Sequence, residues 1–106
     1  MWTRTAGRLL QGQWRLDEAQ PLLEEGLAGN RAVRGDTHPH TLKLIGSLGA
    51  LLRDAGRLDE ARPLIEEAPV GSRAVRGDTH PHTLILIGNL GRLQEDQGQL
   101  DEAQPL

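Results

Sequence analysis

The 106-residue sequence contains no cysteine, phenylalanine or tyrosine, and its aromatic residues are limited to Trp2 and Trp14. The lack of cysteine excludes disulfides, thiolate zinc sites and cysteine nucleophiles. The shortage of aromatic residues removes the usual stacking platforms for nucleic-acid bases. No apolar run is long enough to cross a membrane, and the N-terminus lacks the apolar middle of a signal peptide. These absences predict a protein of the reducing cytoplasm that does not bind membranes.

The charge balance leaves no basic excess. The chain has 12 lysines and arginines against 15 aspartates and glutamates, which gives a formal net charge of −3. A nucleic-acid-binding module normally carries a surplus of positive charge, so we expect no nucleic-acid partner. Hydrophobic residues make up only 37% of the chain, which predicts a soluble domain with a modest core.

A unit of 42 residues is repeated along the chain. The segment RAVRGDTHPHTL begins at Arg31 and begins again at Arg73, 42 residues later. The same offset relates three LDEA segments, which begin at Leu16, Leu58 and Leu100. Self-similarity at a fixed period is the signature of repeat architectures, in which each unit packs on its neighbours.

This period fixes the expected domain organisation. Residues 1–106 are predicted to form a single helical-repeat domain, which consists of a partial repeat 1–34, a full repeat 35–76 and a partial repeat 77–106. We expect the chain to be a piece of a longer array. We also expect end-to-end self-association, because the two ends of this solenoid have no capping helix.

The full repeat predicts a first helix that begins at Pro39, since proline suits the first helical position. Either Thr37 or His38 would be its cap, and the sequence does not choose between them. Gly56 is expected to end this helix, and Gly98 to end its counterpart in the next unit. Apolar residues at three- and four-residue steps form the buried stripe of the helix: Leu42, Ile45, Leu48, Leu51 and Leu52.

A second helix is predicted to open at residues 58–61, where Asp59 and Glu60 lie at the end that the helix dipole favours for negative charge. Its apolar stripe comprises Leu58, Ala61, Leu64 and Ile65. Proline inside a helix costs about 3 kcal/mol, so we expect a kink or break near Pro69 before Gly77 ends the helix.

The order of large and small residues in this unit resembles the tetratricopeptide repeat pattern, in which a large residue, a Leu-Gly pair and a second large residue precede an Ala-x3-large motif. A small residue at Gly49 and at Ala61 lets two antiparallel helices approach closely. The residues that match the pattern are Ile45, Leu48, Gly49, Leu52, Ala61 and Ile65.

The length of the unit, together with GDTHPHTL at 35–42 and LDEARPL at 58–64, resembles the kinesin-light-chain type of this repeat. The resemblance implies an all-α superhelix, or solenoid, of antiparallel helix pairs whose concave face binds peptides or partner proteins. Several positions of the outer units depart from the family pattern, and Thr3 and Ala6 are smaller than it requires. Trp14 stands where the other units have glycine, and Gln94 replaces a large apolar residue.

The resemblance places the concave face on the first helix of each unit. Only Asn89 keeps the amide with which the family often holds the backbone of a bound peptide. The cationic side chains on this face favour an acidic or carboxylate-bearing peptide through charge-assisted hydrogen bonds, although ordinary solvated side chains are the alternative interpretation. The candidate peptide-binding residues are Arg8, Lys43, Ser47, Arg53, Asn89 and Arg92.

Two His-Pro-His segments raise an alternative function, a metal-binding or metal-bridged assembly. The first histidine of each segment belongs to the loop motif of the family, so a cap or a loop hydrogen bond explains it better, and we expect no metal. The four candidate metal ligands are His38, His40, His80 and His82.

Arginines recur around each loop between units, at Arg31, Arg34, Arg73 and Arg76. They suit phosphates or acidic partners, but positive charge at the negative end of the second-helix dipole explains them better.

No pattern predicts catalysis. The paired acids Asp59-Glu60 and Glu66-Glu67 recur with the unit, as solvated helix residues do, and no nucleophile or phosphate-loop motif is present. We therefore predict a non-enzymatic protein without a cofactor, either an interaction module or a structural spacer with no ligand.

Overall fold

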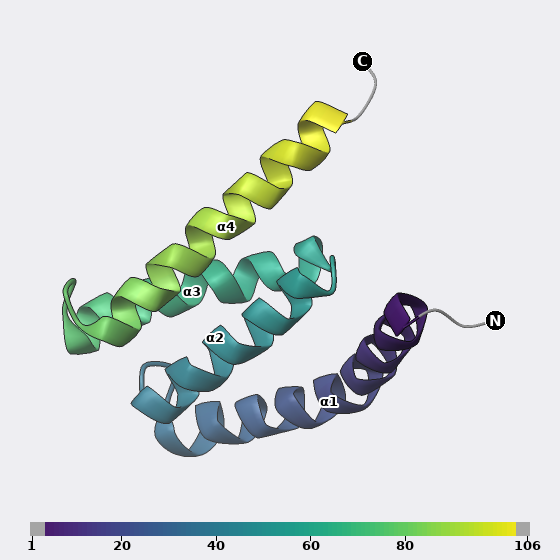
Figure 1. The fold of residues 1–106 in the computed structure, drawn as a ribbon. Helices are drawn as coiled ribbons and strands as arrows, with labels where there is room; N and C mark the ends of the chain where they lie inside the picture. Colours follow the sequence, from purple (N-terminus) through teal and green to yellow (C-terminus); the bar gives the residue numbers. More distant parts are fainter. Residues whose placement is uncertain (1–3, 104–106) are drawn as a thin grey trace.

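The computed structural model describes the backbone of residues 4–103 and the side chains of residues 16–99. Within this range it contains helices and no strands, which confirms the all-α prediction (Figure 1). The four helices in chain order are α1 (Arg4–Arg34), α2 (Pro39–Asp54), α3 (Leu58–Arg76) and α4 (Pro81–Ala103).

Helices α2 and α3 form the antiparallel hairpin predicted for the full repeat. Gly49 and Ala61 permit the close approach, because a Cβ atom built on Gly49 would lie 2.8 Å from Cγ1 of Ile65. Leu48, Leu52 and Ile65 fill the space between the helices and are each 2% exposed. This agreement confirms the role predicted for the Leu-Gly and Ala-x3-Ile motifs.

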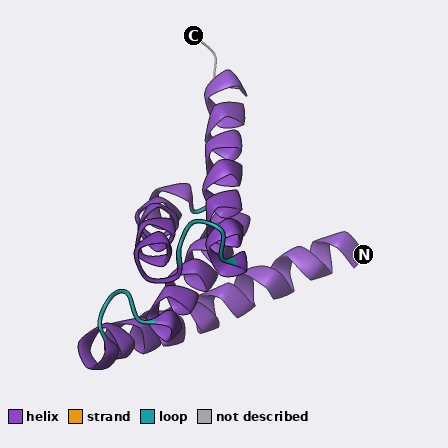
Figure 2. Ribbon diagram, turned by 90° about the vertical axis from the view of Figure 1, so that its left-hand side faces the viewer, coloured by secondary structure: helices purple, strands orange, loops and turns teal. Residues whose placement is uncertain are grey.

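The outer helices pack on opposite sides of the hairpin: α1 contacts α2, and α4 contacts α3 and the edge of α2. Beyond these contacts, α1 and α4 project away from the hairpin in different directions (Figure 2). One hydrophobic core joins all four helices. Its buried members are Leu27, Leu42, Ile45, Leu48, Leu52, Leu58, Ala61, Ile65, Ala68, Leu86 and Leu93.

The helix ends follow the predicted turn chemistry, and the structure decides between the two candidate caps. His38 caps α2, because the backbone N–H of His40 donates to His38 Nδ1 over 3.1 Å. Desolvation, followed by the charge of Arg34 and by His40, lowers the pKa of His38, which favours the neutral imidazole that a cap acceptor requires. Gly56 and Gly77 adopt φ values of +81° and +92° and end α2 and α3 as expected.

Of the kink or break expected near Pro69, the break is wrong. Helix α3 continues through both Pro63 and Pro69 to Arg76. Pro69 and its neighbour Ala68 are buried, so tertiary packing of this turn offsets the lost backbone hydrogen bond. The result is a helix long enough to carry Arg76 up to the next unit.

The expectation that Gly98 ends a helix is also wrong, since α4 runs through Gly98 to Ala103. Helix α1 likewise runs through Trp14 without a break. In the full repeat the turn at Gly56 is stabilised by Ile65 packed over Gly49. At Gly91, which is equivalent to Gly49, a Cβ atom would have no neighbour within 4 Å among the described residues, so no second helix holds α4 to a hairpin there.

Candidate interaction surface

Helices α2 and α4 lie next to each other and form a shared surface, which we call the α2–α4 face. Gly46 lies at their contact, where an added Cβ would come within 2.7 Å of Cδ2 at the end of the Leu86 side chain. Lys43 and Ser47 lie one turn apart on α2, and both are exposed. On α4, Arg92 is exposed and Asn89 is half-buried. Arg8 lies in α1, and its side chain is not among those that the structure describes.

Arg53 does not lie open on this face, because its side chain is only 8% exposed. Its guanidinium donates to Asp54 Oδ1 over 2.9 Å and to Asn89 Oδ1 over 3.4 Å. The sequence predicted both residues for peptide binding and did not predict that they bind each other. In the structure Arg53 and Asn89 connect α2 to α4.

A cavity of about 420 Å³ opens at the N-terminal ends of these two helices, and we call it the basic cavity. None of the described carboxylates lines it. Lys43 and Arg76 contribute permanent positive charges, and neither forms an ion pair with any residue that the structure describes. The basic cavity is lined by Pro39, His40, Lys43, Arg76 and His82.

The histidines of the two His-Pro-His segments divide into two roles. His38 and His80 each accept a backbone N–H through Nδ1, in both cases over 3.1 Å. His40 and His82 line the basic cavity instead. Burial, then the charge of Arg76, His80 and Lys43, lowers the pKa of His82.

This arrangement disfavours a cation. The positive groups beside His40 and His82 repel a metal ion, and no cluster of three or more potential metal ligands occurs among the described residues. His40 is exposed, whereas His82 is half-buried and its Nδ1 is a buried atom without a hydrogen-bond partner among the described residues.

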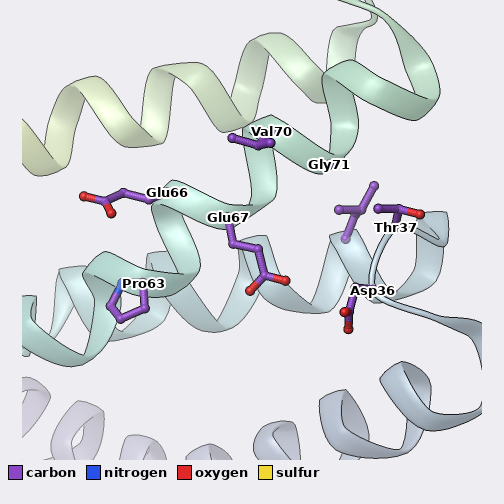
Figure 3. Close-up of a pocket in the computed structure, with 8 residues that line it drawn as sticks. Asp36, Thr37, Pro63, Glu66, Glu67, Val70 and Gly71 are labelled. Atoms are coloured by element: carbon purple, nitrogen blue, oxygen red, sulfur yellow. The ribbon is translucent and has the colours of Figure 1, made fainter.

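A second cavity of about 400 Å³ lies between the loop before α2 and helix α3, and it carries acidic residues (Figure 3). Glu66 and Glu67 point in different directions, as expected of neighbours on a helix, while Asp36 and Glu67 extend toward α1. Arg31 of α1 binds Glu67 with two hydrogen bonds of 2.6 and 2.7 Å and Asp36 with one of 2.8 Å. Glu67 therefore connects α3 to α1, and the cavity shows no pair of carboxylates suited to acid–base catalysis among the described residues.

A family model for the tetratricopeptide repeat matches residues 1–68 and 46–106, which together cover the chain. This chain belongs to the tetratricopeptide repeat family. Tetratricopeptide repeats generally mediate protein–protein interaction. No curated protein and no solved structure matches the chain.

For a tetratricopeptide repeat protein the α2–α4 face corresponds to the first helices of two successive units. The sequence identified four residues of this face: Lys43, Ser47, Asn89 and Arg92. It did not predict that His82 and Arg76 lie beside them in the basic cavity, and Arg76 belongs to a second helix. The repeated arginines and the repeated His-Pro-His segment were the available signals. Among the described helices none has the length and apolar character required to span a membrane.

Proposed function

We propose that this protein is an interaction module that binds an acidic segment of a partner protein along the α2–α4 face, without catalysis. The proposal rests on exposed cations of this face that form no ion pair with the described residues. These are chiefly Lys43 and Arg92. Most other arginines between Arg31 and Arg73 are already paired with carboxylates. Unpaired cations on a binding face attract carboxylates through charge-assisted hydrogen bonds.

We further propose that the repeats are of the kinesin-light-chain type and that the module works in the cytoplasm. The 42-residue unit and the GDTHPHTL segment support the first proposal, and the absence of cysteine supports the second. Neither proposal implies a motor partner, because the chain has no sustained heptad pattern through which such a partner would bind.

A peptide array of acidic, neutral and basic dodecapeptides tests the proposed binding. The variant Lys43→Glu/Arg92→Glu should lose binding to acidic peptides by at least about tenfold, which corresponds to about 1.4 kcal/mol. The control is Arg34→Glu/Arg73→Glu, which changes the net charge equally at exposed residues away from the face and also removes the ion pair of Arg73 with Asp78. The control should bind like the natural chain.

The array also separates an interaction module from a structural spacer. Preference for acidic peptides that survives in the Lys43→Glu/Arg92→Glu variant would contradict the proposal, because the charge would then act elsewhere. Absence of any bound peptide at about 0.15 M salt, where exposed charges are largely screened beyond about 8 Å, would favour a spacer.

A further inference from the structure

The basic cavity has a composition that the binding of an acidic peptide does not explain by itself. Two permanent cations from different helices, Lys43 of α2 and Arg76 of α3, line the same space without a described carboxylate beside them. His40 and His82 add two imidazoles that gain charge when protonated. A ligand group that neutralises the charges of Lys43 and Arg76 needs more negative charge than one carboxylate carries.

We propose that the basic cavity holds the phosphate group of a phosphorylated partner segment. A phosphate monoester carries a charge of about −1.5 to −2 at neutral pH and presents three acceptor oxygens. Arginine and lysine are the side chains that proteins use to bind such groups. The inference rests on the proposed function, since the phosphate would belong to the segment bound on the α2–α4 face.

The side chains, and not the helix ends, would hold the phosphate. Pro39 has no backbone N–H to offer, and the N–H groups of His40 and His82 already donate to His38 and His80. The groups that remain are the ammonium of Lys43 and the guanidinium of Arg76, since Nδ1 of His82 is buried. The volume of about 420 Å³ leaves room for an ester attached to a chain as well as for the phosphate itself.

The repeat supplies a matched control for this site. Arg34 stands one unit before Arg76, ends helix α1 as Arg76 ends α3, and is exposed outside the basic cavity. Arg76→Gln and Arg34→Gln therefore remove the same charge from equivalent helix ends. Equal far-UV circular dichroism of both variants shows that each remains folded.

The first experiment is a titration of the full chain with sulfate at constant ionic strength, followed through the ring signals of the histidines in NMR spectra. The rings of His40 and His82 should shift in a saturable manner in the natural chain and in Arg34→Gln. Arg76→Gln should weaken the apparent affinity about tenfold. Shifts that do not saturate, or that are equal in both variants, would overturn the proposal.

The pH dependence gives a second readout, because sulfate keeps its charge where the histidines titrate. Burial, and then the charges of Arg76, His80 and Lys43, lower the pKa of His82 below its ordinary value of 6.5. The affinity for sulfate should therefore increase as the pH falls below about 6.5 and His82 gains a proton, and part of the increase should depend on the bound anion. An affinity that is independent of pH would contradict a role for the histidines.

The final comparison uses an acidic peptide from the array with serine or phosphoserine at one position. Phosphorylation should tighten binding about tenfold in the natural chain, and Arg76→Gln should abolish that gain. If sulfate binds but no phosphoserine position improves affinity, the site takes free anions and the proposal is wrong. If acidic peptides bind but phosphorylation does not tighten their binding, only this inference fails. If the natural chain binds no acidic peptide at all, the proposed function itself is contradicted.

Discussion

Gly49→Ala should lower the free energy of unfolding by about 1–3 kcal/mol, the usual cost of an additional methyl group in a packed core. The new Cβ would lie 2.8 Å from Ile65 Cγ1 and 3.3 Å from Leu64 Cβ. Neither atom is the free end of a flexible side chain, and Ile65 is almost fully buried. Relief of the clash therefore requires α2 and α3 to separate.

The equivalent substitution one unit later, Gly91→Ala, should have the opposite sign. No described atom lies within 4 Å of the Cβ position at Gly91, and alanine is favoured over glycine inside a helix by about 0.5–1 kcal/mol. Urea unfolding followed by circular dichroism measures both effects. Similar changes for the two variants would show that the hairpin does not depend on the contact between Gly49 and Ile65.

Thr83→Val should lower the free energy of unfolding by about 1–3 kcal/mol, the cost of leaving a buried hydroxyl without a partner. Ser72 Oγ and Thr83 Oγ1 are 2.6 Å apart and form a hydrogen bond between α3 and α4. Both residues are fully buried. Water therefore does not replace the hydroxyl that valine removes.

Thr41 provides the control, because it is the equivalent of Thr83 in the preceding unit and is equally buried. Its Oγ1 has no hydrogen-bond partner among the described residues, and Asn30, which stands where the next unit has Ser72, donates to Gly26 O instead. Thr41→Val should therefore be neutral or stabilise the fold by up to about 1 kcal/mol. Equal losses from the two threonine variants, measured by the same unfolding experiment, would contradict this account.

The sequence predicted the hairpin well because its determinants are local in the repeat. Gly49, Ala61 and Ile65 occur at family spacing, and Gly56 lies at a turn with positive φ. The predicted stop at Gly98 failed for a non-local reason. Glycine permits the turn, but a second helix packed on the first one stabilises it, and the open space at Gly91 shows that α4 lacks such a partner among the described residues.

The candidate site was predictable only in part. Periodicity placed Lys43 and Arg92 on the first helices, where they are exposed. It did not reveal that Arg53 is buried against Asn89, since burial depends on how closely α2 and α4 approach at Gly46. Nor did it join Arg76 to His82, because that meeting requires α3 to continue unbroken through Pro69 to Arg76.

Residue-by-residue mapping of a bound acidic peptide tests the proposed interaction surface most directly. In ¹⁵N-labelled protein, titration with an acidic dodecapeptide should shift backbone amide signals at residues 40–47 and 82–92, on the α2–α4 face. The amides around exposed Val33 and Val70, which lie on α1 and α3, should not move. Shifts concentrated on α1 and α3, with residues 40–47 unchanged, would contradict the account.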